Sequence, residues 1–591
     1  MKSCLYLQLI VSLAALSLPL RADEGDASTP AKAAAGKLVR LTIAGAVFEA
    51  DPPLTFFGGS AGATLRDIVA VIRKARKDPA TSGMILRLRS PLVGWTQLQT
   101  IRRELLELRK AGKKSHCHLS YVDGRSYLLA SACSDVSLLP AGVVEMPGLS
   151  LSRMYMKDLL GKLGIEFQVL RMGRYKSAAE TYTRNGPSDA VREESHAIVD
   201  ELFDEYVNSI AENRSIKPIV VRGLIDRAIF SPKEAKEAGL VDHLEYQDEF
   251  LSRVKEGIAS AKIVDAKLGK KLNLQAGGLP GLMTIFNQIF GGPSRSRSSK
   301  KPKIAVIYGV GPIVESGQAS LFGGQLFTSR QMVKLFRQVR ADESVKAVVF
   351  RVDSPGGSAI ASDIILREVK LTAEKKPVVV SMGDLAASGG YYVSCGATWI
   401  VAENSTLTGS IGVIGMIPNM KKLYEMVGVS YERFSRGKLA NMVSAYGELT
   451  EDGRELLMKY MRAVYEQFLQ HVAQGRKLPK DAVASIAEGR VWTGGQALKH
   501  GLVDELGGLE TALAKARSLA GLPEDVDVYS LPKPKNLFEI LSELDGASGE
   551  LRMLVRQLPV DLRHLAGQLE WVQAARKERA LLVLPEIFVI E

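Results

Sequence analysis

A chain of 591 residues is too long for a single hydrophobic core, so two or more domains are expected. Its 46% hydrophobic and 24% charged residues are ordinary for a folded body and exclude a wholly disordered chain. The net charge of +12 is compatible with nucleic-acid or membrane binding, but the basic run from Arg295 to Lys303 has no interleaved aromatic residue. We interpret this run as a solvated linker and expect no nucleic-acid partner.

The N-terminus has the pattern of an export signal. Lys2 is followed by an apolar stretch from Leu5 to Leu20 and then by Arg21, Ala22 and Asp23. A basic start, a short apolar segment and a small residue before a polar segment are typical of a signal peptide. The stretch is short for a spanning helix, which needs roughly 20 apolar residues. We therefore predict a cleaved signal peptide or an uncleaved signal anchor, with the body facing an extracytoplasmic space.

Cysteine usage gives no sign of a disulfide framework or a zinc site. Outside the N-terminal segment the chain has Cys117, Cys133 and Cys395, an odd number without a CxxC pair. We expect buried free thiols, and we expect no metal and no other cofactor.

The rest of the chain is a diverged internal duplication. Asp78–Pro91 runs parallel to Asp342–Pro355 at a shift of 264 positions, and Ala238–Asp242 is echoed by His500–Asp504 at a shift of 262. Repeats of this length are duplicated domains rather than solenoid units. The predicted segments are a signal peptide or anchor, an N-terminal repeat, a linker rich in Gly, Pro, Ser and basic residues, a C-terminal repeat and a C-terminal extension, over residues 1–22, 37–250, 270–303, 304–522 and 523–591.

Each repeat alternates short apolar runs with helical patterns. In the second repeat, buried strands are predicted at Ile304–Tyr308, Ala347–Val352 and Val378–Ser381, and helices at Ser329–Arg340 and Ala359–Ala373. Strands separated by helices predict βαβ crossovers. The predicted fold class is therefore α/β, with two tandem repeats and mostly parallel sheets.

The two repeats differ most where the second one reads Ser388-Gly389-Gly390, because the first repeat is three residues shorter there. A serine that opens a helix lies where backbone N–H groups can stabilise an oxyanion, and the glycines let a substrate backbone approach. Ser-Gly-Gly is also an ordinary helix start, so this difference alone does not identify a nucleophile.

A second difference runs in the opposite direction. Lys176 of the first repeat aligns with Ala440 of the second. One repeat thus keeps a serine without a lysine, and the other keeps a lysine without a serine. Such complementary loss is expected of one composite site assembled across both repeats, with Ser388 as nucleophile and Lys176 as base.

Two further features are confined to the second repeat. Its predicted strand at Ala347–Val352 is followed by Gly356-Gly357, whereas the first repeat has Leu92-Val93 at that point. Tandem glycines at a strand end can turn backbone N–H groups outward as an oxyanion hole. Ser410 is another hydroxyl that only the second repeat carries.

Four motifs occur together in this chain: GRYKSAAE, RVDSPGG, GDLAASGGYY and STLTGSIGVIG. With these motifs, residues 37 to about 520 resemble signal peptide peptidase A of the long, tandem-repeat type. The resemblance implies a ClpP/crotonase-like fold and serine endopeptidase activity against cleaved signal peptides in or at the membrane. It also implies a homotetramer at the bacterial cytoplasmic membrane, with the catalytic body on the extracytoplasmic, periplasmic side.

The resemblance also implies roles for single residues. It makes Ser388 the nucleophile and Lys176 the general base, and Ser410 a residue that orients the lysine. It locates the oxyanion hole at the DSPGG turn, with the Gly357 N–H as donor. The tandem glycines and the helix start make the N–H groups of Gly356, Ser388 and Gly389 further candidates.

The chemistry sets a condition on the lysine. An ordinary lysine, with a pKa of about 10.4, is protonated at neutral pH and is no base. Burial disfavours the charged form and lowers the pKa. We therefore expect Lys176 in an apolar cleft, which would also suit a hydrophobic peptide bound in extended form along a strand edge.

Three alternatives stay open at the level of sequence. A Ser–His enzyme would need His116 or His118, for which we favour a structural role, because neither has a counterpart in the second repeat. An acyl-CoA hydratase or isomerase on the crotonase fold would leave the export signal unexplained. A catalytically silent envelope scaffold would leave the intact Ser388 and Lys176 unexplained.

Overall fold

The computed structural model describes residues 36–50, 62–256, 258, 262–268, 301–316, 326–532, 581–583 and 589–590. The predicted signal segment, nearly all of the predicted linker and most of the predicted extension lie outside these ranges. Within them, every helix is too short or too polar to cross a bilayer.

The first repeat begins with alternating strands and helices and continues with a more helical second half. Its elements are β1 (Lys37–Ala46), α1 (Leu65–Lys77), β2 (Thr81–Leu92), α2 (Trp95–Lys110), β3 (Lys114–Val122), α3 (Gly124–Ser131), β4 (Asp135–Glu145), β5 (Leu151–Ser152), α4 (Lys157–Lys162), β6 (Glu166–Met172), α5 (Glu180–Thr183), α6 (Asp189–Arg214), α7 (Pro218–Arg227), β7 (Ile229–Phe230), α8 (Pro232–Glu237), β8 (His243–Leu244), α9 (Gln247–Glu256) and β9 (Lys262–Asp265). Strands β1 to β4 pair in parallel, and the strand order is β7-β4-β3-β2-β1-β9.

The second repeat follows the same plan. Its elements are β10 (Lys303–Val310), β11 (Ile313–Val314), β12 (Phe327–Thr328), α11 (Ser329–Ala341), β13 (Val345–Ser354), β14 (Gly356–Ser358), α12 (Ala359–Ala373), β15 (Val378–Ala387), α13 (Gly389–Ser394), β16 (Trp399–Ala402), β17 (Leu407–Gly409), β18 (Val413–Asn419), α14 (Lys421–Met426), α15 (Glu451–Arg476), α16 (Lys480–Ile486), β19 (Val491–Thr493), α17 (Gly494–Lys499), β20 (Glu505–Leu506), α18 (Leu509–Ala520) and β21 (Asp527–Leu531). Its main sheet has the order β19-β17-β15-β13-β10-β21 and is parallel except for the β17–β19 pair.

These two sheets confirm the predicted α/β class with mostly parallel strands. Both extend beyond the predicted boundaries of the repeats. The short strand β9 pairs with β1 past residue 250, and β21 pairs with β10 past residue 522. Each adds a parallel edge strand, which a boundary drawn from sequence similarity misses.

The duplication is visible in matching contacts. Helices α6 and α15 have 26 residues each, and the arginine that ends each helix pairs with an aspartate, Arg214 with Asp242 and Arg476 with Asp504. In each copy a buried tyrosine hydroxyl also donates to the carbonyl of an equivalent leucine, Leu240 or Leu502. The two chain segments therefore adopt the same local structure despite their diverged sequences.

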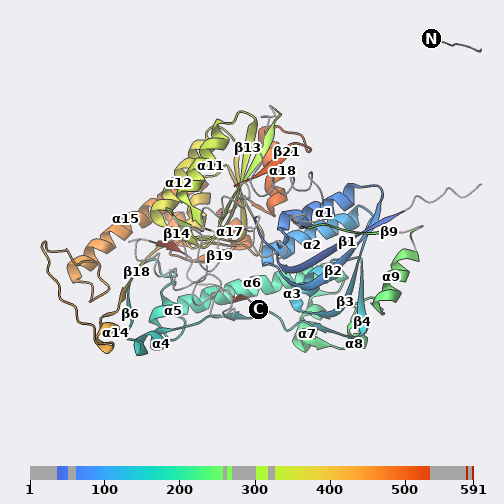
Figure 1. The fold of residues 1–591 in the computed structure, drawn as a ribbon, viewed down its shortest axis with the longest axis horizontal. Coiled ribbons are helices and arrows are strands. Elements are labelled where there is room, and N and C mark those ends of the chain that lie inside the picture. The colour runs from blue at the N-terminus through green and yellow to red at the C-terminus, as the bar shows by residue number, and fades with distance from the viewer. Residues whose placement is uncertain are drawn as a thin grey trace, which may run out of the picture.

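A third sheet joins the two repeats. Its order is β12-β11-β14-β22-β18-β6, where β22 (Leu581–Val583) comes from the C-terminal extension. Strand β6 of the first repeat pairs antiparallel with β18 of the second, and both lie beside α14 in Figure 1. The last strand, β23 (Val589–Ile590), pairs with β5. The repeats thus share backbone hydrogen bonds as well as side-chain contacts.

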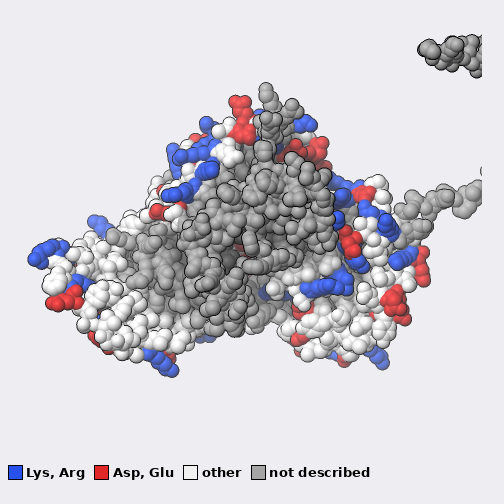
Figure 2. Space-filling model, in the orientation of Figure 1, with Lys and Arg blue, Asp and Glu red and all other residues white. Residues whose placement is uncertain are grey.

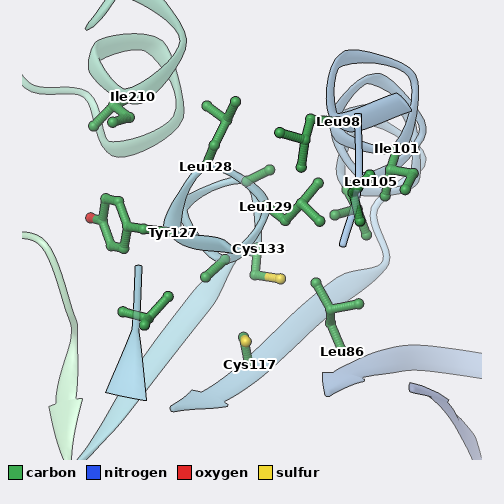
Figure 3. Close-up of a cluster of buried hydrophobic side chains, with 14 of the residues drawn as sticks. Leu86, Leu98, Ile101, Leu105, Cys117, Tyr127, Leu128, Leu129, Cys133 and Ile210 are labelled. Carbon is green, nitrogen blue, oxygen red and sulfur yellow. The ribbon is translucent and has the colours of Figure 1, made fainter. Parts of the chain in front are cut away.

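Each repeat has its own hydrophobic core. In the first, Leu98, Ile101 and Leu105 line one face of α2 at helical spacing and pack towards Leu86 of β2 (Figure 3). Cys117 also points into this core, as Figure 3 shows. Like Cys133 and Cys395, it is a buried free thiol, as predicted. Burying each large aliphatic side chain contributes about 1.5–3 kcal/mol.

Lysine, arginine and acidic side chains all occur on the described parts of the surface in Figure 2.

One ion pair is buried between the repeats. Arg351 of β13, 1% exposed, donates from Nε to Glu49 Oε2 at 2.8 Å. Burial raises the pKa of Glu49, but Arg351 outweighs this and holds it below its usual value. Gln97 donates to the other carboxylate oxygen at 3.0 Å.

The buried ion pair between Arg351 and Glu49 predicts that removing one partner destabilises the protein. Glu49→Ala leaves the Arg351 charge buried and unpaired, which lowers the free energy of unfolding by about 3–5 kcal/mol. Urea denaturation followed by tryptophan fluorescence measures it. The control is Lys422→Ala, which removes the exposed inter-repeat pair with Glu166 and costs less than about 1 kcal/mol. Equal losses in the two variants would contradict the prediction, and adding Arg351→Met to Glu49→Ala should restore much of the stability.

Candidate active site

Ser388 stands at the junction of β15 and α13 in an unusual backbone conformation. Its φ is 55° and its ψ is −111°, and its side chain is fully buried. Such a conformation costs of the order of 1–3 kcal/mol and persists only where neighbours hold it. Here the Ser388 N–H donates to the Gly409 carbonyl at 2.8 Å, and the Ser388 carbonyl accepts from Tyr392 N–H at the start of α13.

Lys176 lies in the turn after β6, and it too is fully buried. Its Nζ is 2.8 Å from Ser388 Oγ, 2.9 Å from Ser410 Oγ and 3.0 Å from the Ser410 carbonyl oxygen. The two residues are 212 positions apart in the chain. The structure therefore brings together the serine of one repeat, the lysine of the other, and Ser410.

These surroundings disfavour the charged form of the lysine. Burial lowers the pKa of Lys176 well below its usual value of 10.5, against a smaller opposing effect of the Glu194 carboxylate. In its neutral form the amine has two N–H donors and one lone pair. Ser410 offers an acceptor for each donor, and in that form the lone pair is available to the Ser388 hydroxyl.

A loop that the sequence analysis did not single out holds both sides of this contact. Tyr175 N–H donates to the Glu488 carbonyl at 2.8 Å, and Ser410 N–H donates to the Arg490 carbonyl at 2.7 Å. Gly489, between them, has a φ of 80° and lies against Lys176: a Cβ at this position would be 2.6 Å from Lys176 N. Only glycine fits this approach.

The signal that found Ser388 could have found Gly489 as well. At a shift of 262, the corresponding residue of the first repeat is Arg227, so the glycine is peculiar to the second repeat. The Arg490 side chain adds a further link, because its guanidinium lies over the Tyr175 ring and donates to Glu193. Glu194 accepts from Val491 N–H at 2.6 Å, which fastens the end of the loop to α6.

Two of the four predicted oxyanion donors are engaged elsewhere. Ser388 N–H is bound to Gly409, as above, and Gly356 N–H donates to Ser354 Oγ at 3.1 Å. Neither is therefore placed as the sequence predicted. Gly357 and Gly389 lie close together, since a Cβ on Gly389 would be 3.0 Å from Gly357 N. A Cβ on Gly357 would collide with the Ile313 carbonyl, so this position requires glycine.

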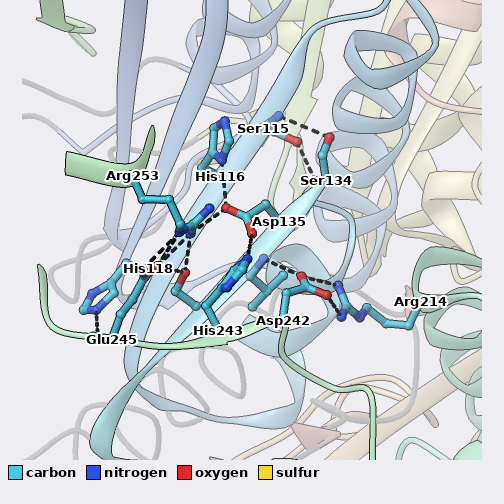
Figure 4. A network of polar contacts seen from close by, with 12 residues as sticks. Ser115, His116, His118, Ser134, Asp135, Arg214, Asp242, His243, Glu245 and Arg253 are labelled. Atoms are coloured by element: carbon cyan, nitrogen blue, oxygen red, sulfur yellow. Dashed lines mark hydrogen bonds and ion pairs between the residues drawn. The ribbon is translucent and has the colours of Figure 1, made fainter. Parts of the chain in front are cut away.

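The two histidines weighed as bases lie in a different network (Figure 4). His116 Nδ1 is 2.8 Å from Asp135 Oδ2, and His118 Nε2 is 3.0 Å from the Glu245 carbonyl. Arg253 of α9 contacts both acidic residues, so the network fastens α9 to the sheet of the first repeat. Among the described residues, no group of three or more His, Cys, Asp or Glu side chains is placed to hold a metal ion.

The fold and the site define a mostly parallel α/β enzyme in which a serine hydroxyl is held against a buried amine. A family model described as Peptidase family S49 matches residues 107–261 and 370–523, one stretch in each repeat. The chain belongs to this family and is a serine-type peptidase. This membership favours a serine peptidase over the acyl-CoA enzyme and the silent scaffold.

Curated relatives cover most of the chain. "Serine protease SPPA, chloroplastic" of Arabidopsis thaliana is 33% identical over 85% of this chain and 73% of its own length. "Protease 4" of Salmonella typhi is 33% identical over 88% of this chain and 84% of its own. Among solved structures, the 1510-N membrane-bound stomatin-specific protease is 16% identical and covers 39% of this chain and 99% of its own, with a TM-score of 0.26.

Gly489 gives a direct test of the site's geometry. Gly489→Ala pushes Lys176 away from Ser388, and misplacement by about 1 Å costs roughly 100-fold in rate, so kcat/KM on a chromogenic peptide should fall about 10- to 100-fold. The matched control is Gly428→Ala, where φ is 75° and nothing lies within 4 Å of the added Cβ. Gly428→Ala introduces the strain of an alanine at positive φ without any new contact, so its kcat/KM should stay near the wild-type value. Equal loss in both variants would show that strain, and not contact with Lys176, is responsible.

Proposed function

We propose that the chain is a Ser–Lys dyad endopeptidase that degrades cleaved signal peptides in or at the membrane. The observation that carries the proposal is the 2.8 Å contact between Lys176 Nζ and Ser388 Oγ in a fully buried setting. A serine needs a base to become nucleophilic, and a lysine becomes a base only when it is neutral. The direction of the Lys176 pKa meets that requirement.

The proposed mechanism follows from these positions. Ser388 Oγ forms a bond to the scissile carbonyl carbon while its proton passes to Lys176 Nζ. The oxyanion is stabilised by the N–H groups of Gly357 and Gly389. As the C–N bond breaks, Lys176 returns the proton to the leaving amine and an acyl-enzyme remains. Water then attacks the ester, again giving a proton to Lys176, which passes it to Ser388 as the acid leaves.

Several observations support signal peptides as the substrate class. A relative named "Putative signal peptide peptidase SppA" from Enterococcus faecium is 32% identical over 39% of this chain. In the turn that carries Lys176, Ala178 and Ala179 pack with Ile414 in an apolar cluster. A hydrophobic side chain of a peptide is stabilised when it moves from water into such surroundings.

The proposal extends to location and assembly. Residues 1–22 have the pattern of a signal peptide or anchor, which supports attachment to or export across the bacterial cytoplasmic membrane, with the catalytic body on the extracytoplasmic side. The family resemblance supports a homotetramer. Size-exclusion chromatography with light scattering of the detergent-extracted full chain tests the assembly.

The central experiment compares the wild type with Ser388→Ala on a synthetic hydrophobic signal peptide. The wild type should cleave the peptide and react covalently with a fluorophosphonate probe, and Ser388→Ala should do neither. Cleavage that persists in Ser388→Ala would assign the nucleophile elsewhere. If the probe labels the wild type but the peptide is not cleaved, Ser388 remains the nucleophile and signal peptides are rejected as the substrate class.

The role proposed for Lys176 predicts how kcat/KM depends on pH. Only neutral Lys176 takes the proton from Ser388, so kcat/KM should rise with pH along a single ionisation. Burial lowers the pKa of the cationic acid, so the midpoint should lie below the usual 10.5 of lysine. It should lie above roughly 6.5, the value for an unperturbed histidine. A pH–rate profile on a chromogenic peptide measures it.

Two variants of Lys176 test its proposed role as general base. Lys176→Ala should abolish activity as fully as Ser388→Ala. Lys176→Arg should not restore it, because a guanidinium stays protonated at any pH that the protein survives. Wild-type rates at neutral pH in Lys176→Arg would contradict the general-base role and leave Lys176 as a structural cation.

A further inference from the structure

An aspartate shortly before Ser388 binds the start of a helix in the other repeat. Asp384 lies near the end of β15, and its Oδ1 accepts from the Thr96 N–H at 2.7 Å and from the Thr96 hydroxyl at 2.7 Å. Thr96 is in the first turn of α2, in the first repeat. The carboxylate of Asp384 therefore acts as an N-cap for α2, because it satisfies one of the backbone N–H groups that the start of a helix leaves without a partner.

The residue at the N-cap position of α2 leaves room for this carboxylate. It is Gly94, and a Cβ at this position would collide with the carboxylate of Asp384. At a shift of 264 positions the second repeat has Ser358 instead, whose hydroxyl caps α12 from within the same repeat by accepting from the Ala361 N–H at 3.2 Å. The first repeat has thus lost the cap that the second repeat keeps, and Asp384 replaces it.

The aspartate equivalent to Asp384 in the first repeat has a different partner. Asp123 caps its own helix, α3, by accepting from the Ser126 N–H at 2.8 Å. In the second repeat the three additional residues move the helix start, so α13 begins after Ser388, whose side chain makes no cap hydrogen bond. The insertion that contains the candidate nucleophile therefore leaves Asp384 available to bind the other repeat.

The end of β15 is also embedded between the two hydrophobic cores. Leu385 and Ala387 pack against the core of the first repeat, whereas Ala386 packs in the core of the second. Alternate residues of a strand point to opposite faces, so β15 lies between the two cores where it approaches the serine. From the second repeat, Asp353 of β13 accepts from the Leu385 N–H at 3.0 Å. The position of Ser388 therefore depends on contacts with both repeats.

We propose that Asp384 is a positioning residue for the candidate nucleophile, and that its hydrogen bonds to Thr96 make the geometry of Ser388 depend on the docking of α2. While the repeats are docked, these bonds hold the end of β15 in place. Without them, Ser388 is held less firmly against Lys176. This inference rests on the proposed peptidase function and deepens it, since it names a contact that couples the docking of the repeats to activity.

The first test compares Asp384→Ala with Asp123→Ala. Each variant removes an aspartate that caps a helix, so the melting temperature should fall by roughly 2–4 °C in both. Only Asp384→Ala removes the link to β15, so its kcat on a chromogenic peptide should fall about 10- to 100-fold, with KM within about twofold of the wild-type value. Asp384→Asn keeps an oxygen acceptor for Thr96 and should retain kcat within about threefold. An unchanged kcat in Asp384→Ala would overturn the proposal.

A double variant separates the helix cap from the position of the serine. When Gly94→Ser is combined with Asp384→Ala, the carboxylate no longer fills the space beside residue 94, and the new hydroxyl caps α2 as Ser358 caps α12. The melting temperature should return to near the wild-type value. The kcat should stay as low as in Asp384→Ala, because no bond to β15 is restored. If kcat recovers together with the melting temperature, Asp384 acts only through stability and the proposal is wrong.

The rate of labelling by a fluorophosphonate probe distinguishes this inference from the proposed function. Labelling needs only an activated serine and no peptide substrate, so its rate should fall in Asp384→Ala by the same factor as kcat. A wild type that is neither labelled nor able to cleave peptides contradicts the proposed peptidase. Equally fast labelling of the wild type and Asp384→Ala contradicts the positioning role and leaves the peptidase intact.

Discussion

The backbone ladder between β6 and β18 is the constraint on which the site depends. Its pairs run from Glu166 opposite Asn419 to Met172 opposite Val413, so the end of a first-repeat strand lies beside the start of a second-repeat strand. A slip of one residue would turn every side chain of β6 to the opposite face. Because Lys176 follows β6 closely, the register of this ladder decides whether its amine meets Ser388.

Ser388 and Lys176 can be predicted from the sequence because each is present in one repeat and absent from the other, and the structure brings both side chains together. Five regular elements of the second repeat are predicted from the pattern of apolar residues. Helix α12 has the predicted bounds, and α11, β10 and β13 differ from theirs by only a few residues, but β15 continues six residues past the predicted Ser381. These features are local or repeated, so they leave a pattern in the chain.

The features that the sequence did not reveal depend on contacts between distant segments. Gly489 must be glycine because the backbone of Lys176 packs against it, and this contact forms only in the folded chain. The N–H groups of Ser388 and Gly356 are occupied because both residues have a positive φ, which orients these groups towards Gly409 and Ser354. The pattern of residues does not predict these hydrogen bonds. Strand β22 has three residues, too few for a periodicity, and it joins a sheet more than 150 positions away.

The division of the dyad between the repeats has a consequence for how the protein is made and inherited. The ribosome delivers Lys176 first and Ser388 212 positions later, so on the proposed mechanism a nascent or truncated chain holds no complete catalytic pair. On that mechanism the enzyme is inert until both halves have folded on each other. On the same mechanism, a chain that lacks either copy lacks one of the two catalytic side chains.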